Sequence, residues 1–274
     1  MTNNDAYEPF ELILPFERGN FKFALFDFDG TLSLIREGWQ GIMVPMMIEL
    51  LMLTPHHETQ DEITLIVQEF VSELTGKQTI YQMIRLAEEI EKRGGTPLDS
   101  MLYKNAYHER LMLRIKDRIR DLEQKIVSPE EMAVPGSIEF VKQLHSRGIK
   151  CFLASGTDEK YVLREAELLG LTPYFEAISG AQDDYKNFSK KMVIDHIIQS
   201  HNLSGSEFIS FGDGYVEIEN TKSVSGVAVG VATNESERCG IDAWKRNRLI
   251  AAGADLIIPD FRETNMLINY FLPS

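Results

Sequence analysis

Six short apolar runs are spread along the chain, and each ends at polar or turn-forming residues. The first run ends in two aspartates within residues 27–29, and the other five follow Pro135. Such runs are typical of strands that are buried on both faces of a sheet. The strands predicted in this way are residues 21–29, 150–155, 174–179, 207–212, 226–232 and 254–259.

Helical patterns separate the later strands, at residues 136–147, 159–169, 190–200 and 242–252. Alternating strands and helices predict an α/β fold, a Rossmann-like, doubly wound sheet whose strands are mainly parallel. Ligands of such sheets bind at the carboxyl ends of the strands. The functional residues are therefore expected directly after Phe28, Ala154 and Phe211.

The segment between the first and second strands has helical periodicity only. Its predicted helices are residues 38–53, 58–74, 78–92 and 98–125. A crossover between parallel strands needs about a dozen residues, so roughly a hundred indicate a separate domain. We expect an all-helical domain at residues 34–133, inserted into an α/β core of residues 1–33 and 134–274. Residues 1–20 are expected to be an arm or an edge segment of that core.

The composition narrows the classes of protein and partner. With 43% hydrophobic residues the chain can build a core, which excludes global disorder. No apolar stretch is long enough for a transmembrane helix, and the N-terminus lacks the pattern of a secretory signal. Two cysteines suit a reducing, cytoplasmic location. A net charge of −14 argues against nucleic acid as a partner and implies that any phosphorylated substrate needs a local cation.

The most informative string is Asp27-Phe28-Asp29-Gly30-Thr31, at the end of the first strand. Carboxylates two residues apart on a strand point to the same face. They repel each other unless a cation, a shared proton or a role in proton transfer compensates. By itself the string is also compatible with an Asp-Gly turn at the end of a strand.

Two further strand ends carry matching chemistry. Asp213 follows the run at 207–212, with Glu217 four residues on, and acids from two parallel strands converge as oxygen ligands that suit Mg²⁺. Ser155 and Gly156 end another strand, where a hydroxyl and exposed amides can hold phosphate oxygens. A lysine at the start of the helix at 190–200 can add a positive charge. Together these residues predict a site for a phosphate and a metal ion.

At these residues the chain resembles the haloacid dehalogenase-like superfamily. The matches are DFDGT at residues 27–31, Ser155, a lysine preceding a helix and the acidic motif at Asp213. The inserted segment is similar to the helical cap of one class of that superfamily. The resemblance implies a Mg²⁺-dependent phosphoryl-transfer enzyme, a phosphoric monoester hydrolase, in which Asp27 is the nucleophile that forms an aspartyl-phosphate and Asp29 is the general acid and base.

The resemblance also implies the roles of the remaining residues. Mg²⁺ is expected on Asp27, Asp29 through its backbone carbonyl, and Asp213. Glu217 stands where the family has an aspartate, so its position as a direct or an outer ligand stays open. Phosphoryl oxygens are expected on Thr31, Ser155 and Gly156. Lys190 is expected to hold Asp27 and the phosphate, with Lys191 and Lys186 as alternatives.

The inserted cap is expected to choose the leaving group. Arg36 and Trp39 follow the catalytic loop, and they either contact the substrate or fix the hinge of the cap. Lys77 and Gln78 either face the site or belong to a helix stop with a capping box from Thr75 to Gln78.

The substrate is expected to be a small phosphorylated metabolite, for example a sugar phosphate, and not nucleic acid or membrane lipid. The presence of Asp29 favours chemistry on a phosphate ester or anhydride, or a mutase reaction, because family dehalogenases lack this second aspartate. The alternatives are a phosphomutase of the β-phosphoglucomutase type, an inorganic pyrophosphatase, and a phosphate-ligand binding or regulatory module without activity.

Overall fold

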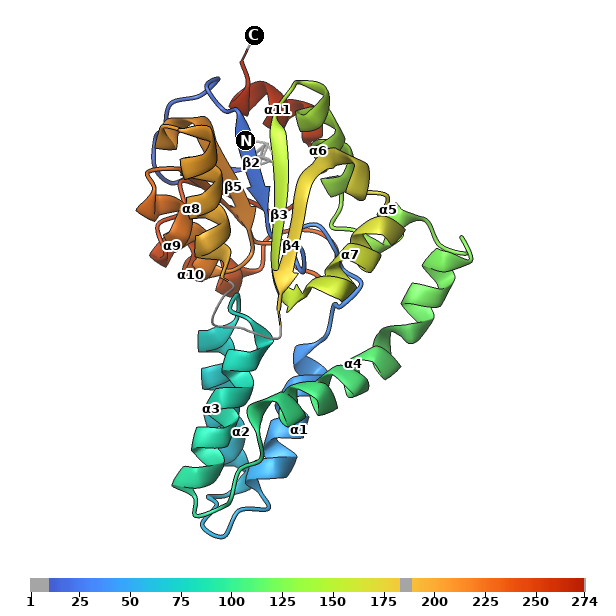
Figure 1. Ribbon diagram of the computed structural model, residues 1–274, viewed down its shortest axis with the longest axis vertical. Coiled ribbons are helices and arrows are strands. Elements are labelled where there is room, and N and C mark those ends of the chain that lie inside the picture. Colours follow the sequence, from blue (N-terminus) through green and yellow to red (C-terminus); the bar gives the residue numbers. More distant parts are fainter. Residues whose placement is uncertain (1–9, 183–188, 274) are drawn as a thin grey trace, which may run out of the picture.

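The computed structural model describes residues 10–182 and 189–273, and in these a seven-stranded sheet lies between helices (Figure 1). The strand order is β1-β7-β6-β5-β2-β3-β4. β1 pairs with β7 in the antiparallel sense, and the other neighbouring pairs are parallel. The strands are β1 (Glu11–Leu12), β2 (Phe23–Phe26), β3 (Lys150–Asp158), β4 (Phe175–Ala181), β5 (Phe208–Gly212), β6 (Val227–Val231) and β7 (Leu256–Ile258).

The predicted α/β fold is confirmed, and each of the six apolar runs overlaps one of the strands β2 to β7. β3 and β4 extend two or three residues beyond the predicted ends. The strand β1 lies in the segment that was expected to be an arm or edge, and it forms one edge of the sheet. It is only two residues long, so it leaves no alternating pattern in the sequence.

Helices cover both faces of the sheet. Packing against the residues of the sheet places α8, α9 and α10 on one face and α6, α7 and α11 on the other (Figure 1). The polar helix α9 has no apolar stripe, which is why periodicity does not predict it. The helices are α6 (Ser137–Ser146), α7 (Glu159–Leu168), α8 (Lys190–His201), α9 (Tyr215–Ser223), α10 (Ala243–Ala251) and α11 (Thr264–Phe271), with the short α5 (Pro129–Met132) before them.

The central strand β2 shows how the sequence builds this core. Phe23 and Leu25 pack with residues of α8, whereas Ala24 and Phe26 belong to the cluster on the opposite face, because alternate side chains of a strand point to opposite sides. Phe26 stacks on Phe211 of β5 with ring centroids 4.8 Å apart. The end of β2 is thereby fixed from both faces.

Four helices lie between β2 and α5 and stand beyond the carboxyl ends of the parallel strands (Figure 1). They are α1 (Gln40–Leu51), α2 (Gln60–Leu74), α3 (Thr79–Lys92) and α4 (Ser100–Glu123). An isolated bridge joins Ser33 to Ala133, where the chain leaves the sheet and returns to it. In the described part of the chain, no helix has the length and apolar character required to cross a bilayer.

Candidate active site

A cavity lies where the carboxyl ends of β2, β3 and β5 face the helices α1 to α4. Its empty space is about 810 Å³ and is open to solvent. From the sheet side it is lined by Asp27, Asp29, Ser155, Gly156, Thr157, Asp158, Lys190 and Asp213. From the helical side it is lined by Arg36, Trp39, Met43, Thr75, Gly76, Lys77, Thr79, Gln82, Lys104, Tyr107, His108 and Leu111.

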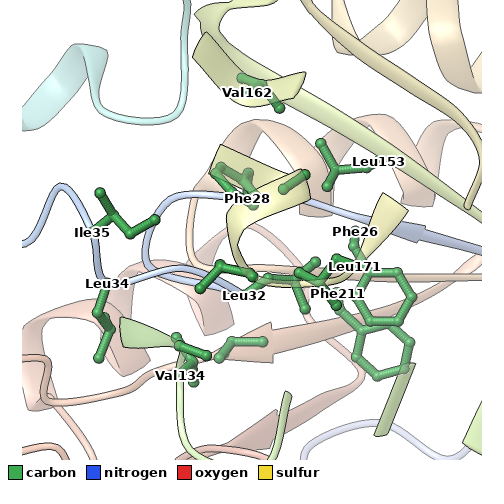
Figure 2. Close-up of a cluster of buried hydrophobic side chains, with 14 of the residues drawn as sticks. Phe26, Phe28, Leu32, Leu34, Ile35, Val134, Leu153, Val162, Leu171 and Phe211 are labelled. Atoms are coloured by element: carbon green, nitrogen blue, oxygen red, sulfur yellow. The ribbon is translucent and has the colours of Figure 1, made fainter. Parts of the chain in front are cut away.

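A buried phenylalanine fixes the two neighbouring aspartates. Phe28 is fully buried and packs in a hydrophobic cluster with Leu32, Leu153 and Val162 (Figure 2). Asp27 and Asp29, one residue to either side of it, both line the cavity. The core therefore anchors the residue between the two carboxylates.

Asp27 is buried, and its carboxylate has a cationic partner. The Asp27 Oδ1 accepts a hydrogen bond of 2.7 Å from the backbone N–H of Phe28 and lies 2.7 Å from the Nζ of Lys190. Lys190 also contacts the carboxylate of Glu217, which is buried in the first turn of α9. The structure therefore brings Lys190 to Asp27, and it places Glu217 on this lysine.

The other two candidate lysines are not brought to Asp27. Lys191 is exposed on α8 and pairs with Asp195 one turn further on, with a distance of 2.8 Å between Nζ and Oδ2. Lys186 lies outside the described residues.

Burial gives this cluster unusual electrostatics. Burial raises the pKa of Asp27 well above its usual range, and Glu217 and Asp213 raise it further, while Lys190 opposes them. Burial alone would lower the pKa of Lys190, but the facing carboxylates of Asp27 and Glu217 raise it. Lys190 is therefore charged, and Asp27 needs more positive charge nearby than one lysine supplies to be fully ionised.

Hydroxyl groups at the end of β3 orient Asp29. The Thr157 Oγ1 donates a hydrogen bond of 2.8 Å to the Asp29 Oδ2, and the Ser155 Oγ donates a longer one of 3.5 Å to the same oxygen. The Asp29 Oδ1 is 3.8 Å from the Nε of Arg36. Thr157 belongs to the same strand end as Ser155 and, two residues further on, points to the same face.

Asp213 follows β5, and both its backbone N–H and its carboxylate have partners. Its N–H donates a hydrogen bond of 3.0 Å to the Oγ1 of Thr31. Its Oδ2 is 2.8 Å from the Nζ of Lys245, which also contacts Glu235. Burial alone would lower the pKa of Lys245, but these two carboxylates raise it, so the lysine is an ammonium ion.

The structure does not place Thr31 among the residues that line the cavity, and its binding of phosphoryl oxygens stays a prediction. Thr31 is fully buried. Its hydroxyl oxygen accepts the N–H of Asp213, so Thr31 ties the loop after β2 to the end of β5. Ser155 and Gly156, in contrast, do line the cavity.

The fit of a metal ion rests on the chemistry of these donors. Among the described residues, no three Asp, Glu, His or Cys side chains are placed around one point as a closed metal site. Asp27 and Asp213 are nevertheless two oxygen donors in one cavity. Mg²⁺ is commonly held by one or two carboxylates together with water and substrate phosphate.

The charge of the site agrees with that chemistry. Among the described residues, the carboxylates of Asp27, Asp29, Asp213, Glu217 and Glu235 pair with three cationic groups, on Lys190, Lys245 and Arg36, and Arg36 is shared with Glu165. A phosphate anion entering this cavity would meet excess negative charge unless a divalent cation accompanied it. The residues present therefore fit Mg²⁺.

Arg36 lines the cavity, but its guanidinium is paired with a buried carboxylate of α7. It is buried, and its guanidinium donates hydrogen bonds of 2.7 to 3.1 Å to both carboxylate oxygens of Glu165 on α7. Of the two alternatives for Arg36, this geometry favours fixing the hinge. Trp39 is half-buried and lines the cavity.

The loop from α2 to α3 lies over Gly156. Lys77 lines the cavity and is exposed, whereas Gln78 is buried and is not among the lining residues. A Cβ added at Gly156 would be 2.9 Å from the carbonyl oxygen of Lys77. The predicted capping box is wrong, because Thr75 ends α2 and its hydroxyl donates to the carbonyl of Val71.

Helix α4 contributes cavity residues that the sequence patterns did not indicate. They are spaced three and four residues apart, which places them on one face of the helix, and this spacing could have been recognised in the sequence. These residues are Lys104, Tyr107, His108 and Leu111. Lys104 pairs with Asp158 at the end of β3. Burial lowers the pKa of His108 to about 4, so this imidazole is neutral near pH 7.

Comparison with known proteins gives a family and a set of similar folds. The model of the haloacid dehalogenase-like hydrolases matches residues 21–222. No curated protein matches the chain. A predicted phosphoglycolate phosphatase from Haemophilus somnus has 14% sequence identity and a TM-score of 0.59, with 90% of this chain and 98% of that chain covered.

Two other solved structures are similar over comparable lengths. A β-phosphoglucomutase from Clostridium difficile has 13% identity and a TM-score of 0.59, with 90% of this chain and 99% of that one covered. A variant of CbbY from Rhodobacter sphaeroides, in complex with xylulose-(1,5)bisphosphate, has 15% identity and a TM-score of 0.58, with 89% and 96% covered. At these identities the likeness concerns the fold.

Proposed function

Because the chain belongs to the haloacid dehalogenase-like hydrolases, we propose that it is a Mg²⁺-dependent phosphatase acting on a small phosphorylated metabolite, such as a sugar phosphate. The observation that carries this proposal is the convergence of Asp27, Asp29, Lys190, Ser155 and Asp213 on one cavity at the strand ends. These residues supply a nucleophile, a proton donor, positive charge and oxygen ligands in one place.

The first step is attack of an Asp27 carboxylate oxygen on the phosphorus atom. A bond forms between that oxygen and phosphorus, the bond from phosphorus to the leaving oxygen breaks, and Asp29 gives its proton to the leaving oxygen. In the second step Asp29 takes a proton from water as the water oxygen attacks phosphorus. The bond to Asp27 then breaks and inorganic phosphate is released.

Other groups of the chain stabilise the charge of the phosphoryl group. In this proposal Lys190, 2.7 Å from Asp27, neutralises charge there and at the phosphoryl oxygens, and the Ser155 hydroxyl and the Gly156 amide donate hydrogen bonds to those oxygens. Asp27, Asp213 and the backbone carbonyl of Asp29 would hold Mg²⁺. When bound, that ion offsets the negative charge of phosphate and carboxylate.

We also propose that residues 34–133 act as a cap domain on a core formed by residues 1–33 and 134–274. The pairing of Ser33 with Ala133 supports these boundaries. In this proposal the helical wall of the cavity, with Trp39, Tyr107 and His108, contacts the leaving group and limits the entry of bulk water during the first step.

The names of the similar structures suggest the first substrates to test. They include a phosphoglycolate phosphatase, a β-phosphoglucomutase and a complex with a pentulose bisphosphate. Phosphorylated sugars and phosphorylated short-chain acids are therefore the first members of a substrate panel, with nucleotides and pyrophosphate added for breadth.

The test is release of inorganic phosphate from this panel, with Mg²⁺ and with EDTA. We expect metal-dependent release from one chemical class, and loss of that release in Asp27→Asn. Asp195→Asn is the matched control, because Asp195 is a partly exposed aspartate on α8 that does not line the cavity. Formation of an isomerised sugar phosphate without phosphate release would indicate a mutase instead of a phosphatase. Full activity of Asp27→Asn would refute the assignment of Asp27 as the nucleophile.

A further inference from the structure

The two carboxylates proposed to hold the metal ion are supported in the same way. Asp27 contacts Lys190, whose second partner is Glu217, and Asp213 contacts Lys245, whose second partner is Glu235. Each carboxylate thus has one lysine, and each lysine has one glutamate. Lys190 was predicted from the family pattern, whereas nothing in that pattern points to Lys245 or Glu235.

Lys245 is held firmly in place. It lies in the first turn of α10, where its N–H donates a hydrogen bond of 2.9 Å to the capping carboxylate of Asp242. Its side chain is 11% exposed, and its Nζ lies 2.8 Å from the Asp213 Oδ2 and 2.5 Å from the Glu235 Oε1. A mostly covered lysine with two carboxylate partners and a fixed backbone has little freedom to move.

The direction of approach separates Lys245 from the reacting groups. Asp213 lines the cavity, but Lys245 and Glu235 are not among the lining residues. The ammonium group contacts the Oδ2 of Asp213, and the Oδ1 accepts no hydrogen bond from the residues that the structure describes. The Asp213 Oδ2 is therefore bound by a lysine outside the cavity lining, and the Oδ1 remains available to a ligand in the cavity.

We propose that Lys245 is a positioning residue that holds the Asp213 carboxylate for the metal ion, with Glu235 neutralising the lysine. This inference rests on the proposed function, since it assigns the metal to the cavity side of Asp213. A hydrogen-bonded ligand binds a metal ion more tightly because its orientation is already fixed. An unneutralised lysine beside that ligand would repel the ion, which accounts for Glu235.

Lys245→Met removes the ammonium group and keeps an unbranched side chain of similar length. The freed Asp213 and Glu235 then repel each other, and Asp213 loses its orientation. We expect metal affinity to fall by about tenfold or more, as for other partners of metal ligands. In the enzyme assay we expect a higher Mg²⁺ concentration for half-maximal rate, with kcat largely recovered at saturating Mg²⁺.

The matched control is Lys222→Met. Lys222 lies on α9 and pairs with the buried Asp255 at 2.7 Å, on residues that do not line the cavity. Both variants remove a lysine from an aspartate that is at most partly exposed, so both should lower stability. Only a positioning role makes the metal affinity of one variant fall while that of the other stays at the wild-type value.

The experiment is a titration of wild-type protein and both variants with Mn²⁺ in the absence of substrate, followed by electron paramagnetic resonance of the free ion. Mn²⁺ accepts the same oxygen ligands as Mg²⁺. Wild-type or tighter affinity in Lys245→Met overturns the inference, tighter binding meaning that the lysine competes with the metal. If Lys245→Met does not fold, Glu235→Gln replaces it, and an unchanged affinity there overturns the inference equally. Absence of Mn²⁺ binding in the wild type would overturn the proposed metal dependence itself.

Discussion

Gly30 offers a sharp test of how the site is packed. Its φ is +75°, and a Cβ at this position would lie 2.3 Å from the Oδ2 of Asp213 and 3.0 Å from the Oε1 of Glu235. Gly148 has a similar φ of +81°, but a Cβ there would meet nothing within 4 Å. The variants Gly30→Ala and Gly148→Ala therefore share the backbone strain and differ only in the contact.

The expected magnitudes follow from this difference. A left-handed conformation costs a non-glycine residue about 1–2 kcal/mol, so Gly148→Ala should lower the free energy of unfolding by about that amount. Gly30→Ala adds an overpacking cost of about 1–3 kcal/mol. To relieve the overlap Asp213 must withdraw by about 1 Å, and a misplacement of that size can reduce activity by about 100-fold.

The assay has two parts. Urea denaturation gives the free energy of unfolding for both variants, and phosphate release gives kcat/KM under conditions where both are folded. We expect Gly148→Ala to keep wild-type kcat/KM and Gly30→Ala to lose about 100-fold. Equal kcat/KM in the two variants would refute the argument that Asp213 and the loop after β2 are in close contact at a working site.

Two buried ion pairs give the remaining predictions. Lys190→Met leaves two buried carboxylates without a counter-ion and should lose about 3–5 kcal/mol of stability together with phosphate release, whereas Lys191→Met should change neither. Burial raises the pKa of the Asp27 carboxyl, so the folded state of Lys190→Met binds a proton more readily than the unfolded state does. The loss of stability measured by urea denaturation should therefore be smaller at about pH 5 than at about pH 8. Glu165→Gln leaves the buried Arg36 unpaired and should cost about 3–5 kcal/mol in the same measurement, while Glu167→Gln on the exposed face of α7 should be neutral. A wild-type free energy of unfolding in either buried variant would contradict these assignments.

Most strands of the sheet can be predicted from short stretches of the sequence. Strands buried on both faces must be apolar along their length, so β2 to β7 are visible as runs. The aspartates at 27 and 29 are visible because they end such a run two residues apart. The predicted elements leave out the two-residue strand β1, the four-residue helix α5, the polar helix α9 and the last helix, α11. The first three have weak local patterns, whereas α11 has an apolar face and was missed although its pattern is visible.

Parts of the site could not be predicted because their partners are distant in the chain. Arg36 and Glu165 are 129 positions apart, and Lys245 and Asp213 are 32 positions apart. No local pattern states that Arg36 will meet Glu165, or that the hydroxyl of Thr31 will be used by the backbone of Asp213. Such pairs depend on how helices dock on the sheet.

The sequence by itself therefore determined the α/β class, and it predicted the strand ends at which Asp27, Asp29, Ser155 and Asp213 line one cavity. These are consequences of burial and of the two-residue period of a strand, which act over a few positions. Only the tertiary structure decided between Lys190 and Lys191 as the partner of Asp27, and showed that Arg36 pairs with Glu165 and that Lys245 contacts Asp213. The reason is that a charged side chain takes its partner from whatever the packed core brings within reach, and that choice is made by the whole fold.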